Sequence, residues 1–127
     1  KVINSIHPTT LYVPSRCDAH TDHQVVFSAT AASAKWFRAK SIKEILCYET
    51  ISETNFSFSG NVFDPNVFVN ITDYIERKCA ILTQYTTEIS EHPFPRSEKA
   101  IRALADLRGS QSGCEAAESF QLVYRFV

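Results

Sequence analysis

The chain has 127 residues, of which 44% are hydrophobic and 21% are charged, and its formal net charge is −1. This length and composition predict a single folded domain over residues 1–127, with a core of its own, and argue against extended disorder. The near-neutral charge argues against a nucleic-acid-binding protein, and no apolar run is long enough to span a membrane.

In the first half of the chain, residues 2–6 have the pattern of the end of a helix. Leu11–Val13 is a short strand candidate, and residues 22–37 have apolar side chains at helical spacing. Residues 42–48 include a nearly continuous apolar run, which is typical of a strand buried on both faces of a parallel sheet. Residues 49–64 are predicted to form a long polar loop. The apolar face of the helix over residues 22–37 would consist of Val25, Val26, Ala29, Ala32 and Trp36. Its small residues, Ala29, Ala31, Ala32 and Ala34, would let it pack closely on the sheet.

In the second half we expect a strand, two helices and a closing segment, over residues 67–69, 71–89, 98–108 and 116–127. Ser97 is a good N-cap for the second of these helices, and Gly109 is expected to end it. The closing segment has the pattern of a short helix or of a helix that runs into a strand. We find no internal repeat.

The four cysteines are widely scattered along the chain, which fits neither a tight disulfide framework nor a zinc ribbon. Cys47 lies in an apolar run and Cys79 lies on an apolar helix face, so both are predicted to be buried thiols. Buried free thiols favour a reducing, cytoplasmic location.

The polar stretch of residues 17–23 follows the first predicted strand and leads into a helix. Open α/β sheets place their ligands at this kind of position, at the carboxyl ends of strands. His20 and His23 are three residues apart, so the first turn of a helix would bring both imidazoles to one side. Asp22 would be a third ligand or would orient His20. The pattern is typical of part of a catalytic zinc site, which uses three protein ligands and a water.

Two other interpretations of this stretch stay open. Cys17, His20 and His23 have a spacing that suits a closed structural zinc site. Alternatively, the stretch is a polar loop that caps the helix through Asp18 or Thr21.

The sequence Asp-Ala-His-Thr-Asp-His at residues 18–23, placed after a strand and Pro14, resembles the second motif of the LmbE-like (PIG-L) family of zinc-dependent N-acetyl-sugar deacetylases. Further stretches are similar to the family in the same order, at residues 68–74, 91–105, 108–110 and 116–120. The resemblance implies an α/β fold, a Rossmann-like three-layer sandwich.

The first metal motif of that family, of the type His-Pro-Asp-Asp, is not in this sequence. His7-Pro8-Thr9-Thr10 is similar but has no carboxylates, and it lies too close to His20. We therefore interpret the chain as the C-terminal half of a deacetylase domain, without the first strands and the first metal motif. The zinc cofactor would take its other ligands from upstream of residue 1, and the 127 residues alone are expected to be inactive.

The resemblance also implies roles for individual residues. His23 would be a zinc ligand. His20 would face the substrate and either stabilise the tetrahedral oxyanion or protonate the leaving amine, while Asp22 would orient His20. The implied reaction is metal-assisted hydrolysis of the N-acetyl group of an N-acetylglucosamine-type conjugate, which releases acetate and a free amine.

Other residues are expected to contact the sugar conjugate. Glu49, Thr50 and Ser52 follow the buried strand on the same sheet edge as the histidines, and Asp18 belongs to the histidine motif itself. Arg96 would hold an anionic group of the substrate. The expected partner is this N-acetylated conjugate, homo-oligomers stay open, and neither nucleic acid nor a membrane span is expected. The alternative function is a non-catalytic, truncated or degenerate domain that binds sugar or assembles with a partner.

Overall fold

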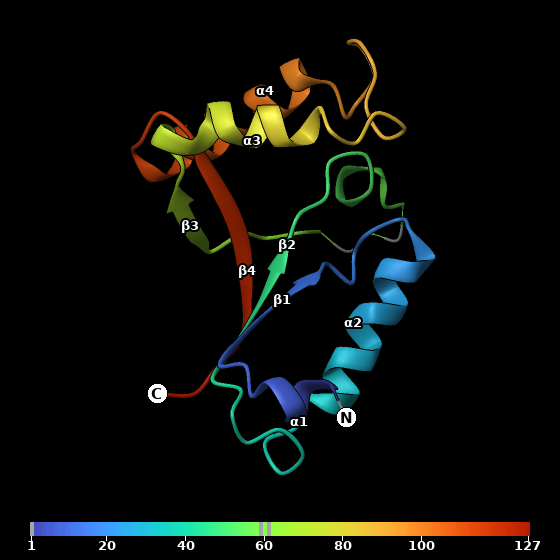
Figure 1. The fold of residues 1–127 in the computed structure, drawn as a ribbon, viewed down its shortest axis with the longest axis vertical. Coiled ribbons are helices and arrows are strands. Elements are labelled where there is room, and N and C mark those ends of the chain that lie inside the picture. The colour runs from blue at the N-terminus through green and yellow to red at the C-terminus, as the bar shows by residue number, and fades with distance from the viewer. Residues whose placement is uncertain (1, 59, 61) are drawn as a thin grey trace. The chain divides into compact units, whose positions relative to one another are not determined.

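A computed structural model describes residues 2–58, 60 and 62–127, and its elements are labelled in Figure 1. The chain forms two compact units, unit 1 with residues 1–67 and 120–127 and unit 2 with residues 68–119. Unit 1 contains α1 (Val2–Ile6), β1 (Thr10–Pro14), α2 (Thr21–Ser33), β2 (Glu44–Tyr48), the 3-10 helix η1 (Thr54–Phe56) and most of β4 (Ala117–Arg125). Unit 2 contains most of β3 (Val67–Asn70), the 3-10 helix η2 (Thr72–Tyr74), α3 (Ile75–Leu82), α4 (Glu98–Ser112) and the start of β4.

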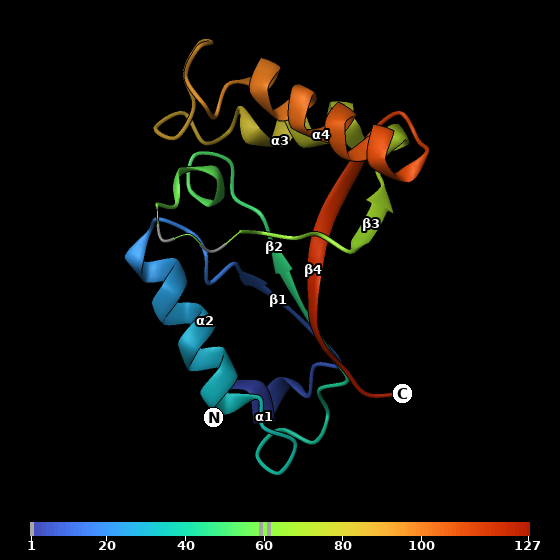
Figure 2. The same cartoon turned by 180° about the vertical axis from the view of Figure 1, so that it is seen from behind.

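The sheet is mixed, with the strand order β1-β2-β4-β3. β1 and β2 are parallel and pair from Thr10 with Glu44 to Pro14 with Tyr48. Parallel neighbours need a crossover, which here contains α2, and Figure 2 shows α2 running alongside β1 in unit 1. β4 is antiparallel to β2, with a register shift at residues 45–46 of β2. The buried strand predicted within residues 42–48 is confirmed as β2. The helix predicted within residues 116–127 is wrong, because Ala117–Arg125 form one long strand.

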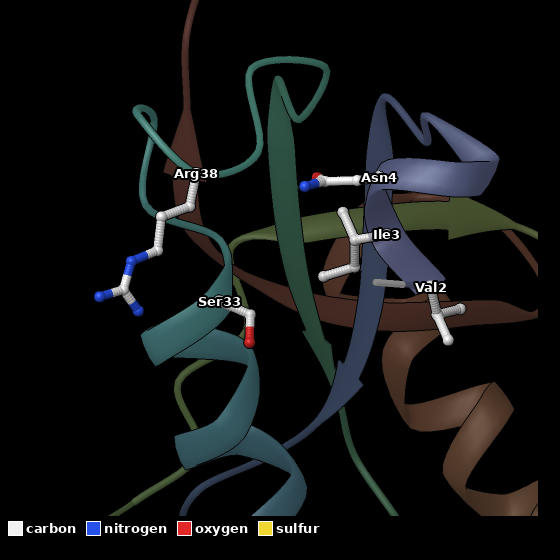
Figure 3. Close-up of a pocket in the computed structure, with 5 residues that line it drawn as sticks. All are labelled: Val2, Ile3, Asn4, Ser33 and Arg38. Carbon is white, nitrogen blue, oxygen red and sulfur yellow. The ribbon is translucent and has the colours of Figure 1, made fainter.

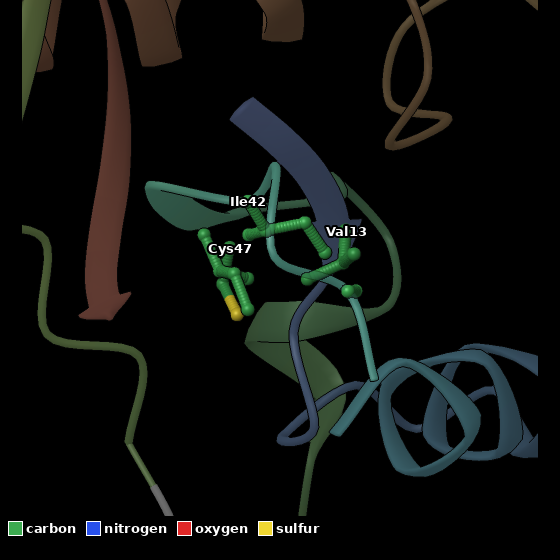
Figure 4. Close-up of a cluster of buried hydrophobic side chains, with 5 residues drawn as sticks. Val13, Ile42 and Cys47 are labelled. Atoms are coloured by element: carbon green, nitrogen blue, oxygen red, sulfur yellow. The ribbon is translucent and has the colours of Figure 1, made fainter. Parts of the chain in front are cut away.

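The core of unit 1 is a cluster of buried side chains from β1, β2 and the turn before β2. Figure 4 shows Val13, Ile42 and Cys47 of this cluster grouped together. Cys47 is only 1% exposed, and its two neighbours Ile45 and Leu46 are also buried, as the continuous apolar run predicts. Phe27 of α2 packs against the same cluster, so that α2 is attached to the sheet.

The helix predicted over residues 22–37 ends earlier, at Ser33. Ala34 caps it, with its N–H bonded to the Thr30 carbonyl at 2.8 Å. The chain then turns, because Ala39 and Ile42 must enter the core, where both are buried. The predicted apolar face is also wrong, since none of the 13 residues of α2, all of them described, is buried. Val25, for example, is 65% exposed.

The helix predicted over residues 71–89 is shorter than expected. The structure has η2 first and then α3, which ends at Leu82. Cys79 is buried, as predicted, whereas Tyr85, which the helical spacing places on the same apolar face, is exposed. The helical pattern therefore continues in the sequence beyond the last turn that tertiary packing stabilises.

α4 begins as predicted, since the Ser97 hydroxyl accepts the N–H of Ala100 at 3.2 Å. Its predicted end at Gly109 is wrong, because the helix continues to Ser112 and ends before Gly113, whose φ is +80°. Gly109 serves a close approach instead. A β-carbon there would lie 2.5 Å from the carbonyl oxygens of Cys114 and Glu115.

Candidate functional site

The candidate site lies at one edge of the sheet in unit 1. β1 and β2 are parallel and end side by side, at Pro14 and Tyr48, so the loops that follow them leave the sheet at the same edge. The backbone N–H of Ala19 in the first loop donates to the carbonyl of Glu53 in the second loop at 3.1 Å. This is the carboxyl edge at which open α/β sheets bind ligands.

His20 is the N-cap of α2, in extended backbone conformation, and its Nδ1 accepts the backbone N–H of Asp22 at 3.2 Å. A cap at Asp18 or Thr21 was the expected alternative, and it is wrong because the imidazole takes this place. Since Nδ1 accepts a hydrogen bond, the proton of the neutral ring is assigned to Nε2. His20 therefore offers an N–H donor at Nε2.

His23, one turn further on, has the opposite arrangement. Its Nδ1 lies 2.7 Å from Oδ2 of Asp18, and because a carboxylate only accepts hydrogen bonds, Nδ1 carries the proton of the neutral ring. The lone pair is then on Nε2, and the side chain is 27% exposed. The two rings are stacked with centroids 5.1 Å apart. The pair thus presents one hydrogen-bond donor, at Nε2 of His20, and one nitrogen lone pair, at Nε2 of His23.

Asp18 is 0% exposed, and both of its carboxylate oxygens have partners. Oδ2 accepts from His23, and Oδ1 accepts from the hydroxyl of Thr54 at 2.6 Å. This placement beside His23 differs from the substrate contact predicted for Asp18, because a fully buried carboxylate has no surface for a ligand. Thr54 was not predicted. It lies 36 residues further along the chain, and only the shared sheet edge could have indicated it.

The other predicted site residues lie at different places. Asp22 is exposed in the first turn of α2, where a negative charge is favourable, and its contact with His20 is made by its backbone N–H. Glu49 is half-buried directly after β2, on the same edge as the histidines. Arg96 belongs to unit 2, where its Nε–H donates to the Glu88 carbonyl at 2.8 Å.

Of the side chains that the structure describes at this edge of the sheet, His23 alone is placed to serve as a zinc ligand. Among the described residues no group of three or more His, Cys, Asp and Glu side chains could hold a metal ion. The closed structural site of Cys17, His20 and His23 is therefore not formed. Cys17 is buried, and its N–H is bonded to the Ser15 hydroxyl at 3.1 Å. The neutral Nε2 of His23 is the atom suited to zinc in unit 1.

The buried carboxylate of Asp18 also influences two neighbouring acids on β2. Burial raises the pKa of the Cys47 thiol to about 11, and electrostatic interactions with Cys17 and Asp18 act in the same direction. Burial and then Asp18 also raise the pKa of Tyr48. Both groups therefore stay protonated near neutral pH, so neither serves as a base or a thiolate nucleophile there.

A hollow elsewhere in unit 1 is distinct from this site. Figure 3 shows its lining, which consists of Val2, Ile3 and Asn4 from α1 together with Ser33 and Arg38. It lies at the C-terminal end of α2, whereas the histidines lie at the N-terminal end. The Arg38 guanidinium donates to the Ala32 carbonyl at 3.1 Å, as a cation at a helix C-terminus commonly does.

No helix in the described part of the chain is long and apolar enough to cross a membrane.

Comparison with known proteins identifies a structural likeness and no sequence match. No family model and no curated protein sequence matches the chain. Among solved structures, the chain is similar to the N,N'-diacetylchitobiose deacetylase from Pyrococcus horikoshii, solved in complex with its inhibitor MPG, with a TM-score of 0.68 and 17% sequence identity. The match covers 97% of this chain and 48% of the deacetylase, so the chain spans about half the length of that protein. At this identity the likeness shows a common mixed α/β fold.

Proposed function

We propose that the chain is the C-terminal half of a zinc-dependent deacetylase of the LmbE-like (PIG-L) type, which removes the acetyl group from an N-acetylglucosamine-type conjugate. The observation that carries the proposal is the opposite hydrogen bonding of His20 and His23 at the carboxyl edge of a parallel strand pair. The fold likeness to a diacetylchitobiose deacetylase supports the same class of substrate.

In the proposed reaction, the two histidines have separate tasks. His23 holds the metal through Nε2, and zinc when bound supplies an activated water and a Lewis acid for amide hydrolysis. His20 donates from Nε2–H to the oxygen of the acetyl group as negative charge develops there. Such a donor lowers the barrier by about 3 kcal/mol when it is well placed. The Nδ1 atom of His20 accepts the backbone N–H of Asp22, so it has no room for a second ring proton. This hydrogen bond favours stabilisation of the oxyanion by His20 over protonation of the leaving amine.

The proposed half-site takes its other ligands and its general base from polypeptide outside these 127 residues. Two observations support this. The chain spans 48% of the structurally similar deacetylase, and the described residues supply His23 without two further ligands beside it. Zinc, a cytoplasmic location and an N-acetylated sugar as partner belong to the same proposal.

The test is acetate release from N,N'-diacetylchitobiose and other N-acetylglucosamine conjugates by the longest polypeptide that the gene encodes, loaded with zinc. We expect His20→Ala and His23→Ala to reduce kcat at least about 100-fold. Only His23→Ala should also lose zinc, as measured by metal analysis of the purified protein. Lys99→Ala, on exposed α4 surface in unit 2, is the control and should retain activity.

Acetate release that survives both histidine substitutions would contradict the proposal. The 127-residue chain alone should bind zinc weakly and release no acetate. Tightly bound zinc in the isolated chain would contradict the half-site, and zinc-independent sugar binding without turnover by the longest polypeptide would favour the non-catalytic alternative.

A further inference from the structure

We propose that Asp18, held by Thr54, is a positioning residue that fixes the imidazole of His23 with Nδ1 protonated and Nε2 available to a metal. The use of Nε2 as a ligand rests on the proposed function. The carboxylate–imidazole–hydroxyl arrangement is a property of the fold, and it can be tested in the metal-free chain.

Asp18 is held by hydrogen bonds to both its side chain and its main chain. Its carboxylate accepts from His23 Nδ1 at 2.7 Å and from the Thr54 hydroxyl at 2.6 Å. Its backbone N–H donates to the Ser15 carbonyl at 3.2 Å, and its carbonyl accepts from Nε2 of Gln24 at 2.8 Å. With the main chain and both carboxylate oxygens bonded, the side chain has one orientation, and it directs Oδ2 at His23.

Thr54 sets the direction of the hydrogen-bond chain. Its Oγ1 accepts the backbone N–H of Thr50 at 2.7 Å, and it donates its single proton to Asp18. The N–H of Ala19 donates to the carbonyl of Glu53, next to Thr54, at 3.1 Å. The loop after β2 therefore supports the loop after β1 across the sheet edge, and the position of His23 depends on both.

The burial of Asp18 is not explained by a capping role, because His20 caps α2. A fully buried carboxylate is unfavourable unless its charge is compensated by hydrogen bonds, so a simple polar loop would not need one. A carboxylate bound to the Nδ1–H of a histidine is the usual outer partner of a metal-ligating imidazole, where it fixes the tautomer and raises the basicity of the ligating nitrogen.

The first measurement is the tautomer of His23 in the metal-free chain, from two-bond ¹⁵N–¹H correlations of the ring in mildly alkaline solution, where imidazoles are neutral. We expect the Nδ1–H form in the wild type. Asp18→Asn has the same shape, but its amide can also donate to the ring, so we expect a shift to the Nε2–H form. Asp64→Asn, on exposed surface of unit 1, is the matched control and should not change the tautomer.

A second pair of variants tests the hydroxyl. Thr54→Val removes the donor to Asp18 and should increase the Nε2–H form of His23, whereas Thr54→Ser keeps the hydroxyl and should match the wild type. Equal spectra for Thr54→Val and Thr54→Ser would contradict the part assigned to Thr54. An Nε2–H form in the wild type overturns the whole proposal and requires no variant to fold.

Zinc then distinguishes this proposal from the proposed function. Zn²⁺ titrated into the isolated chain should perturb the Nε2 signal of His23, with an affinity about 10- to 100-fold lower in Asp18→Asn. An unchanged affinity despite a shifted tautomer would overturn the positioning role. If His23→Ala binds Zn²⁺ as the wild type does, the proposed function fails, while the tautomer of the wild type still decides whether Asp18 orients the ring.

Discussion

At the scale of single residues, hydrogen-bond partners decide what identical side chains can do. His20 accepts a backbone N–H at Nδ1, and His23 donates from Nδ1 to a buried carboxylate. The ring of His20 therefore carries its proton at Nε2, whereas the ring of His23 carries a lone pair at Nε2. The chain places these opposite tautomers three residues apart, at the start of one helix.

Cys47 allows a pH prediction at the same scale. Burial raises the pKa of its thiol from 9.0 to about 11, so between these values the unfolded chain loses this proton while the folded chain keeps it. Stability therefore falls as the pH rises through this window, by about 2 kcal/mol for this group. We expect urea unfolding to show this loss between pH 9 and pH 11, in the window that the pKa shift sets.

The control for this prediction is Cys47→Ala, which removes the thiol and should flatten the stability profile above pH 9 relative to the wild type. Parallel profiles for the two proteins would show that the thiol does not contribute.

At the scale of elements, backbone contacts with neighbouring segments set where the helices of this chain end. α4 passes through Gly109 because its last turn approaches the carbonyl groups of Cys114 and Glu115. It ends at Gly113, whose positive φ is readily adopted by glycine. A glycine at the end of an apolar pattern thus has two possible meanings, and only the surrounding backbone distinguishes a helix stop from a close contact.

Gly109→Ala tests this interpretation. The new β-carbon would lie 2.5 Å from two backbone carbonyl oxygens, which cannot move as a flexible side chain would. We expect the free energy of unfolding to fall by about 1–3 kcal/mol, although alanine has the higher helix propensity. Ser110→Ala, on the exposed surface of α4, should change it by less than about 0.5 kcal/mol. A more stable Gly109→Ala protein would show that Gly109 is an ordinary helical glycine.

At the scale of the whole molecule, unit 1 carries a large exposed apolar surface. Its aromatic patch consists of Trp36, Phe37, Tyr124 and Phe126, which line two adjoining hollows. Trp36 is 72% exposed and Phe126 is 59% exposed. Exposed apolar groups gathered in this way are typical of surfaces that contact another chain or promote association.

We therefore expect the isolated chain to self-associate as its concentration rises, with a blue shift in the fluorescence of Trp36, the single tryptophan. Phe126→Ser should weaken this association, measured by sedimentation velocity, by removing apolar area from the patch. Phe58→Ser, at a fully exposed phenylalanine outside the patch, is the control. A monomeric chain with unchanged fluorescence at all concentrations would contradict the prediction.

The local pattern of the sequence was sufficient for several elements of the fold. The apolar run around Cys47 predicted the buried strand β2, and Ser97 predicted the start of α4. These features are encoded within a few neighbouring residues, through alternation, burial and capping. The histidine motif was recognisable for the same reason, because its residues are adjacent in the chain.

Tertiary structure alone decided the rest. α2 ends at Ser33 because the following residues enter the core, and the closing segment is a strand because β2 has a free edge for it. Thr54 meets Asp18, 36 residues away in the chain, because the two parallel strands that precede them end side by side. Such contacts depend on which elements become neighbours, and local periodicity does not determine that.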